Sequence, residues 1–438
     1  MNNIFKKITV ELLRNQYWVR SQGKRQARFA VYCQIALMVI PLNIAIAQED
    51  LLNRTHPTAS PSSVSTGVAR TKPPFFTPLP PHIQAKAYIL VDAYSGKVLA
   101  SYQADVRLAP ASLTKMMTAY LVSSALQSGR IRLDDPVFVS KKAGTTGGSR
   151  MFVEPRTQVS VQNLLQGIIV QSGNDASIAI AEHLAGTEQY FTDIMNQQLK
   201  YLGMMATHFA NANGLPHPEH YTTARDMAIL ARAVIMDFPE DYHWYSKKSF
   251  TYNGIKQLNR NRLLWLNPEV DGIKTGDTTE AGFCLVATAV RQGMRLISVI
   301  MGASSDTARI QGGQALLDYG FRFFETHKIQ AANVAIATPR VWFGMHKTVP
   351  VGVESDLYLT LLRGKNPHFK LASVFKESIK TPLLKGETVG QLTVSLNEKQ
   401  LVSVPIVTLE SVKKGGVLRH IWDRCILLLH YIKFFKLS

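Results

Sequence analysis

Two residues near the start of a predicted helix, Ser112 and Lys115, are of types that perform nucleophilic catalysis. They lie three residues apart, so a helix places both side chains on one face about one turn apart. A serine hydroxyl is a weak nucleophile until a base takes its proton, and a lysine can be that base when burial and nearby cations lower its pKa. Amides at a helix start also favour the negative charge that develops there. Taken alone, this S-x-x-K spacing is common and more often means a helix cap and a surface lysine.

Two short motifs further along the chain could complete such a site. Ser172-Gly173-Asn174 lies between two predicted helices and offers a second hydroxyl and an amide, although these residue types also favour plain turns and caps. Lys274-Thr275-Gly276 lies beside a predicted strand. A cation and a hydroxyl flanked by Gly272 and Gly276 suit a substrate carboxylate and a close backbone approach. Each motif is weak alone, but their order and spacing together are specific.

The three motifs, S-x-x-K, S-x-N and K-T-G in this order, resemble the set of penicillin-binding proteins and serine β-lactamases. More specifically, residues 84–437 resemble the D-alanyl-D-alanine carboxypeptidases among the low-molecular-mass penicillin-binding proteins. The supporting runs are Ala111-Ser112-Leu113-Thr114-Lys115-Met116-Met117-Thr118, Gln171-Ser172-Gly173-Asn174-Asp175-Ala176, Thr223-Ala224-Arg225-Asp226-Met227, Asp271-Gly272-Ile273-Lys274-Thr275-Gly276 and Tyr319-Gly320-Phe321-Arg322. This resemblance implies a β-lactamase/transpeptidase-like fold, in which helices flank an antiparallel sheet.

The resemblance also implies an activity: a serine-type carboxypeptidase that removes the terminal D-alanine from peptidoglycan stem pentapeptides and is inhibited by β-lactams. Ser112 would be acylated by the penultimate D-alanine carbonyl, with Lys115 as its base. Ser172 and Lys274 would relay the proton to the departing D-alanine, and Asn174 would orient the substrate amide. No cofactor and no metal are implied.

Four residues are expected to bind substrate. By resemblance, Thr275 beside Gly276 would bind the terminal carboxylate, with Arg309 as a candidate second anchor. Backbone N–H groups of Ser112 and Asp277 would form the oxyanion hole. Asp277 departs from the family pattern, where this position is often His. A carboxylate beside developing negative charge is unfavourable unless it points away or pairs with a cation, so we hypothesise that Asp277 lowers turnover or shifts the pH optimum.

Other functions use the same motifs. A class A β-lactamase needs a carboxylate that activates the deacylating water, and the sequence offers no convincing candidate between Ser172 and Lys274. A D-alanyl-D-alanine endopeptidase would use the same residues and stays open. A non-catalytic wall-binding scaffold would not need the complete set of motifs.

Hydrophobic periodicity predicts an α+β domain over residues 84–326. Two apolar runs, 87–93 and 98–102, are joined by a short Gly-containing turn and predict a hairpin. The other predicted elements are helices over about 112–126, 161–170, 174–185, 188–201, 222–236 and 312–319, and strands over 282–290 and 295–302. Strands, then helices, then strands indicate a sheet built from both ends of the domain.

A small all-β domain is predicted over residues 327–410, followed by an amphipathic helix within 411–438. Short β-rich runs alternate with turn signals at 334–336, 341–343, 357–362, 392–396 and 401–407. From Val417 to Leu437 the pattern is helical, with Arg419, Asp423, His430 and Lys433 on one side and apolar residues on most of the rest. Such a helix suits a membrane surface, and a helix packed on the protein is the alternative.

The N-terminal residues predict export. Lys24, Arg25 and Arg28 precede an apolar stretch, 29–47, that ends in Ala45-Ile46-Ala47. This is typical of a secretory signal cleaved after Ala47, here with an extended n-region, and a retained membrane span is the alternative. A Pro/Ser/Thr-rich linker follows over 48–83.

The basic charge indicates an anionic partner. Removing the seven basic residues and one acidic residue of the leader lowers the net charge from +18 to +12. Nucleic acid is not expected, because no basic stripe with interleaved aromatics is present and an exported protein rarely meets it. We therefore expect a protein on the periplasmic face of the inner membrane, held at an anionic membrane surface through its C-terminal helix.

Overall fold

The computed structural model describes residues 78–364 and 367–435. The predicted signal peptide and residues 48–77 of the predicted linker lie outside the described residues.

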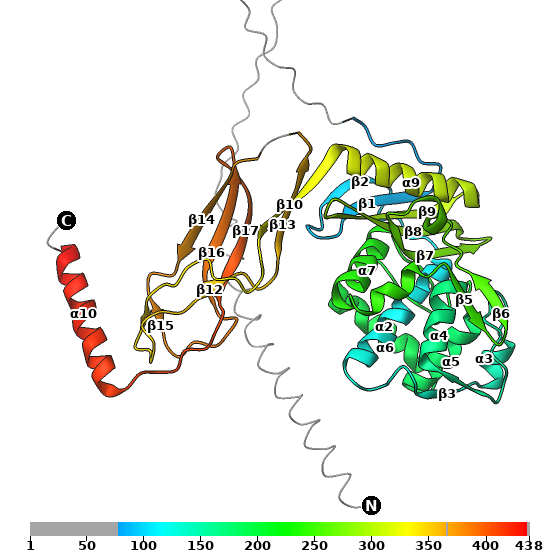
Figure 1. Ribbon diagram of the computed structural model, residues 1–438, viewed down its shortest axis with the longest axis horizontal. Coiled ribbons are helices and arrows are strands. Elements are labelled where there is room, and N and C mark those ends of the chain that lie inside the picture. The colour runs from blue at the N-terminus through cyan, green and yellow to red at the C-terminus, as the bar shows by residue number, and fades with distance from the viewer. Residues whose placement is uncertain (1–77, 365–366, 436–438) are drawn as a thin grey trace, which may run out of the picture. The chain divides into compact units, whose positions relative to one another are not determined.

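A five-stranded antiparallel sheet forms the centre of the first domain, in the order β2-β1-β9-β8-β7 (Figure 1). Its strands are β1 (Ala87–Asp92), β2 (Val98–Tyr102), β7 (Val270–Thr278), β8 (Gly282–Arg291) and β9 (Met294–Ala303). β1 pairs with β2 as the predicted hairpin and also with β9, so strands from both ends of the domain share one sheet. This confirms the predicted α+β class.

Helices cover both faces of this sheet (Figure 1). Side chains alternate between the faces along each strand, so Ile89 and Val91 pack with the larger group of helices while Leu90 packs on the opposite side beside α9. One face therefore holds α9 (Asp306–Phe323). The helical side contains α2 (Lys115–Gln127), α4 (Val161–Gln166), α5 (Asn174–Ala185), α6 (Glu188–Leu202) and α7 (Ala224–Asp237). Each face has its own buried apolar cluster, which fixes the strand register.

Two predicted helices differ from expectation where they meet the motifs. The helix expected from 112 begins as a 3-10 turn, η1 (Ala111–Thr114), and becomes α-helical only at Lys115. The helix expected over 161–170 ends in a π-helical turn, η2 (Gly167–Gln171), after which Ser172 takes a left-handed conformation with φ 65°. Hydrophobic periodicity does not encode these local changes of helix type.

Several short elements were not predicted. They are β3 (Pro136–Phe138), α3 (Lys141–Thr145), β4 (Gln158–Ser160), η3 (Asp241–Ser246), β5 (Ser249–Tyr252), β6 (Ile255–Leu258) and α8 (Leu263–Leu266). Most are too short to show a hydrophobic period.

The β-rich domain has its own core and a four-stranded sheet in the order β12-β17-β16-β14. Its elements are β10 (Phe324–Gln330), β11 (Val341–Trp342), β12 (Val351–Gly352), β13 (Leu357–Leu362), β14 (Phe369–Phe375), β15 (Ile379–Lys380), β16 (Thr388–Leu396) and β17 (Lys399–Thr408). The run 334–336 forms no named strand, and Val334 is exposed. β14 was missed because its side chains are mostly exposed. β10 pairs with β13 and spans the predicted domain boundary after residue 326.

The predicted tail helix is present as α10 (Val417–Phe435). The buried Asp423 carboxylate accepts hydrogen bonds from Arg340 Nη2 at 3.0 Å and the Phe343 backbone N–H at 2.8 Å, and it pairs with Arg419. This helix therefore uses part of its polar side to contact the β-rich domain. Its exposed apolar side chains are Val417, Leu418, Ile421, Trp422 and Leu428.

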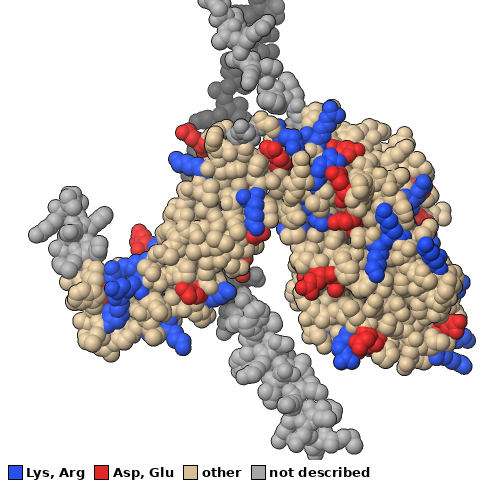
Figure 2. Space-filling model, viewed as in Figure 1, with Lys and Arg blue, Asp and Glu red and all other residues tan. Residues whose placement is uncertain are grey.

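Charged side chains of both signs are interspersed over the face of the molecule shown in Figure 2. No helix in the described part of the chain is both long and apolar enough to cross a bilayer.

Candidate active site

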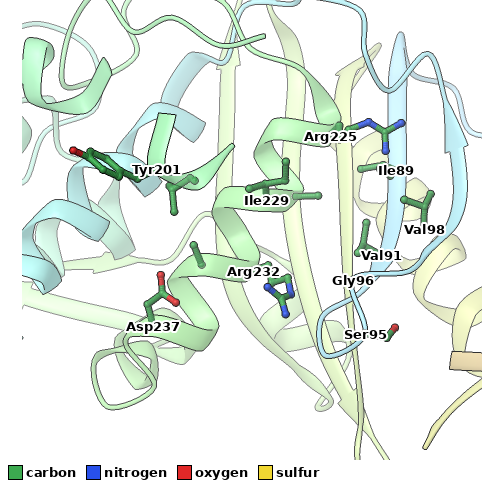
Figure 3. Close-up of a pocket in the computed structure, with 13 residues that line it drawn as sticks. Ile89, Val91, Ser95, Gly96, Val98, Tyr201, Arg225, Ile229, Arg232 and Asp237 are labelled. Carbon is green, nitrogen blue, oxygen red and sulfur yellow. The ribbon is translucent and has the colours of Figure 1, made fainter. Parts of the chain in front are cut away.

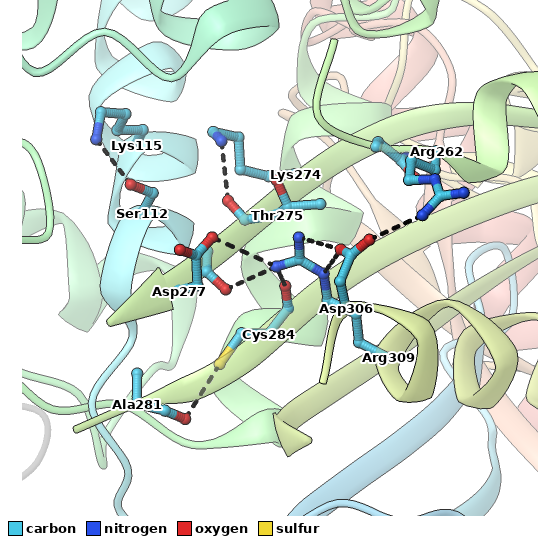
Figure 4. A network of polar contacts seen from close by, with 12 residues as sticks. Ser112, Lys115, Arg262, Lys274, Thr275, Asp277, Ala281, Cys284, Asp306 and Arg309 are labelled. Atoms are coloured by element: carbon cyan, nitrogen blue, oxygen red, sulfur yellow. Dashed lines mark hydrogen bonds and ion pairs between the residues drawn. The ribbon is translucent and has the colours of Figure 1, made fainter. Parts of the chain in front are cut away.

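Ser112 and Lys115 meet as predicted at the junction of η1 and α2 (Figure 4). Lys115 Nζ lies 3.0 Å from Ser112 Oγ, and the lysine side chain is buried. Burial holds the pKa of Lys115 well below its usual range, and the positive charge of Lys274 lowers it further. A neutral amine, which a base requires, is therefore accessible.

The other hydrogen bonds of Lys115 determine whether its amine donates a proton to Ser112 or accepts one from it. Nζ donates to Asn174 Oδ1 at 2.7 Å and to the backbone oxygen of Asn213. Both partners can only accept, so a neutral amine uses its two protons on them and turns its lone pair to Ser112 Oγ. Asn174 and Asn213 thus orient Lys115 as an acceptor of the serine proton. Asn213 was not singled out in the sequence, since a backbone carbonyl carries no residue-type signal.

Asn174, the first residue of α5, has its amide orientation fixed from both ends. Its Oδ1 accepts from Lys115, and its Nδ2 donates to Gly147 O at 2.7 Å. The structure therefore shows Asn174 holding the Lys115 amine in place. Its predicted contact with the substrate amide stays a prediction.

Ser172 is a buried hydroxyl without a partner. The residue is 2% exposed, and among the described residues Oγ has no hydrogen-bond partner. A non-glycine residue in a left-handed conformation costs about 1–3 kcal/mol, and strain of this kind concentrates at functional sites. The unused hydroxyl beside Asn174 fits the predicted proton relay.

Lys274, Thr275 and Gly276 lie on β7, the edge strand beside η1 (Ala111–Thr114), which carries Ser112 and is called the nucleophile turn below. A Cβ on Gly276 would lie 2.9 Å from the Ser112 backbone nitrogen, so only glycine allows the strand this close. Lys274 Nζ donates to Thr275 O at 2.9 Å. Burial, aided by the charges of Arg260 and Arg309, lowers the pKa of Lys274 to about 7. A lysine with this pKa can both hold and release a proton near neutrality.

Asp277 and Arg309 form a polar network behind the end of β7 (Figure 4). Arg309 donates to Gly276 O at 3.0 Å and to Cys284 O at 3.2 Å, and its Nε bonds Asp306 at 2.8 Å. Asp277 Oδ1 lies 3.7 Å from Arg309 Nη1. The cation that could offset Asp277 is therefore present. These contacts occupy the guanidinium, and its role as a second carboxylate anchor stays a prediction.

Two charged residues near the site had no role assigned from sequence. Asp175 is fully buried and accepts from the backbone N–H groups of Met151, Phe152 and Val153, which holds that loop in place. The positive charge of Arg260 lowers the pKa of both Lys115 and Lys274. Asp175 stands within a recognised run and could have been noticed, whereas Arg260 is brought near only by folding.

A cavity of about 560 Å³ lies between the β1–β2 hairpin and α7, and none of the predicted site residues lines it (Figure 3). Its arginines are already engaged, Arg232 with Ala93 O and Arg225 with Asp105. A more open hollow of about 1000 Å³, by contrast, is lined by Asp277, Thr278 and Ser304 among others. This hollow adjoins the end of β7, and Asp277 is the one predicted site residue that lines it.

Comparison with known proteins matches both parts of the chain. The family model described as D-alanyl-D-alanine carboxypeptidase (Peptidase_S11) matches residues 75–305. The model described as penicillin-binding protein 5, C-terminal domain, matches residues 324–414. The two matches follow the order of the α+β domain and the β-rich domain.

Curated relatives and solved structures agree with these matches. D-alanyl-D-alanine carboxypeptidase DacC of Escherichia coli is 44% identical over 358 residues, covering 80% of this chain and 90% of the relative. DacA of the same organism is 43% identical, covering 80% and 89%. The crystal structure of penicillin binding protein 5 from Haemophilus influenzae is 41% identical with a TM-score of 0.70, covering 76% of this chain and 99% of that one.

Proposed function

The chain belongs to the D-alanyl-D-alanine carboxypeptidase family, and on this premise we propose that it removes the terminal D-alanine from peptidoglycan stem pentapeptides through an acyl-enzyme at Ser112. The observation that carries this proposal is the buried Lys115, whose two acceptor partners leave its lone pair for the serine proton. Both halves of the reaction need this arrangement, because the same amine accepts a proton on attack and can return one later.

In acylation, Ser112 Oγ attacks the carbonyl carbon of the penultimate D-alanine while its proton passes to Lys115. The backbone N–H groups of Ser112 and Asp277 stabilise the oxyanion, which forms within reach of both the nucleophile turn and β7. The C–N bond then breaks, and the leaving amine takes a proton through Ser172 and Lys274. Thr275 binds the terminal carboxylate of the departing residue.

In deacylation, water attacks the ester carbon, and the shortened peptide leaves as its acid while Ser112 Oγ regains a proton. A β-lactam acylates the same oxygen by ring opening, so its product stays attached and no free leaving group makes room for water. Inhibition by β-lactams follows from this shared first step.

A labelled penicillin tests the proposal directly. We expect a long-lived covalent adduct on the wild type and none on Ser112→Ala. Failure of the wild type to form an adduct would support the wall-binding scaffold, and rapid turnover of the adduct would support a β-lactamase. D-alanine release from a pentapeptide, compared with cleavage of a cross-linked dimer, then separates the carboxypeptidase from the endopeptidase.

We also propose that the exported enzyme is peripheral on the periplasmic face of the inner membrane, held there by α10. Exposed Leu418, Ile421 and Trp422 support this, since a helix of this kind binds anionic lipid through apolar area and nearby basic residues. Full-length protein should sediment with anionic phospholipid vesicles, and a chain truncated after Lys414 should not, while keeping its penicillin acylation. Equal sedimentation of the two would refute the anchor, and loss of acylation would refute its independence from the site.

A further inference from the structure

One buried polar side chain close to the nucleophile has no part in the reaction as described above. His220 is 4% exposed and lies on the segment that leads into α7. Its Nδ1 accepts a hydrogen bond from the Ala210 backbone N–H at 3.3 Å, so the proton of the neutral ring is on Nε2. Burial lowers the pKa of His220 to about 3, which keeps the ring neutral at physiological pH.

The Nε2 proton has one destination. Nε2 lies 2.8 Å from Thr114 Oγ1, and Thr114 Oγ1 donates to the backbone oxygen of Ala111 at 2.8 Å. A hydroxyl has a single proton, which Thr114 uses on Ala111, so the ring must be the donor in the contact with His220. The two assignments agree. The hydrogen bonds therefore run in one direction, from the Ala210 N–H through His220 and Thr114 to Ala111 O.

The last acceptor in this series of hydrogen bonds, Ala111 O, belongs to the same peptide unit as the Ser112 N–H. A trans peptide is planar, so the direction of the Ala111 carbonyl sets the direction of the Ser112 N–H on the opposite side. Ala111 adopts φ 47°, a left-handed conformation that costs an alanine about 1–2 kcal/mol. A peptide in this unfavourable conformation needs surrounding contacts to hold it.

We propose that His220 is a positioning residue that, through Thr114, holds the Ala111–Ser112 peptide so that the Ser112 N–H points into the oxyanion hole. The inference rests on the proposed function, because it assigns His220 to the oxyanion that this reaction forms. His220 touches neither substrate nor nucleophile. Its loss therefore acts on the transition state and leaves ground-state binding largely unchanged.

Three substitutions separate positioning from general stability. His220→Leu removes the donor and fills the space with an apolar side chain, whereas His220→Gln keeps an N–H for Thr114. Thr114→Val removes the middle hydroxyl with almost no change of shape. The measurement is the saturating rate of acylation by a labelled penicillin, together with kcat and KM for D-alanine release.

We expect His220→Leu and Thr114→Val to lower the acylation rate on the order of 10- to 100-fold, below the cost of deleting an oxyanion donor outright. KM should change by less than about twofold, and the double variant should be no worse than the poorer single one. His220→Gln should recover most of the rate. Should His220→Leu not fold, Thr114→Val carries the same test.

The proposal is overturned if either folded variant keeps the wild-type rate, if only KM changes, or if a folded His220→Gln is as slow as His220→Leu. In all of these outcomes the wild type is still acylated, so the proposed function stands. A wild type that penicillin does not acylate would instead remove the proposed function and this inference with it.

Discussion

Gly214 gives the most direct test of how tightly the nucleophile turn is constrained. It has φ +86°, and a Cβ added there would lie 2.0 Å from Ala111 O and 3.0 Å from Ser112 N. Ordinary contact begins at 3.4 Å, so Gly214→Ala must push the Ala111 carbonyl away by about 1.4 Å. A displacement of about 1 Å at a reacting centre can cost 100-fold in rate, and we expect at least that loss in acylation by labelled penicillin.

Gly203 supplies the matched control. It has nearly the same conformation, φ +78°, but nothing lies within 4 Å of its added Cβ. Both alanine variants incur the left-handed conformational cost of about 1–2 kcal/mol, which lowers Tm by a few degrees. Gly214→Ala adds the clash with the Ala111 backbone, so its Tm should fall further than that of Gly203→Ala. Only Gly214→Ala should lose acylation. If the two variants are acylated at similar rates, the nucleophile turn is not constrained by Gly214 and the reasoning is wrong.

Three further predictions concern charge. We expect protonated Lys274 to attract the substrate carboxylate, so KM should rise as the pH passes about 7. Arg260→Gln removes a cation that lowers the pKa of Lys274, so it should move that rise to higher pH in a KM–pH profile. Asp277→His should raise the acylation rate by less than about tenfold, because Arg309 already offsets the negative charge of this half-exposed carboxylate. An unchanged pH–rate profile would argue against any role of Asp277. Asp423→Ala removes the carboxylate that accepts hydrogen bonds from Arg340 and Phe343 of the β-rich domain. Amide hydrogen exchange in α10 should therefore accelerate, while acylation stays at the wild-type rate. Exchange as slow as in the wild type would show that other contacts hold the helix.

Much of the site could be predicted from the sequence because its side chains belong to short motifs. Ser112 and Lys115 share a helix turn, and Lys274 through Asp277 follow one strand, so local geometry brings each group together. The long apolar strands and helices could likewise be predicted from the periodic spacing of their hydrophobic residues. The hypothesis of a repulsion at Asp277 did not include the ion pair of this carboxylate with Arg309, because Asp277 lies on β7 and Arg309 lies on α9.

What could not be predicted depends on tertiary contact or on the backbone. Asn213 contributes a carbonyl, so its side chain gives no hint of a role in orienting Lys115. His220 and Thr114 lie 106 residues apart and meet only in the folded chain. The left-handed conformations of Ala111 and Ser172 are imposed by their surroundings against the preference of the residue types.

The close approach of Gly276 to the Ser112 nitrogen has a consequence for how the enzyme loses activity. The two backbone donors that we propose for the oxyanion hole, Ser112 and Asp277, lie in separate layers, one on the helical side and one on the outermost strand of the sheet. An outermost strand is bonded on one side only and opens at lower free energy than the core. Urea at concentrations below the global unfolding transition should therefore abolish acylation reversibly. The acylation rate would then measure how well η1 and β7 stay packed against each other.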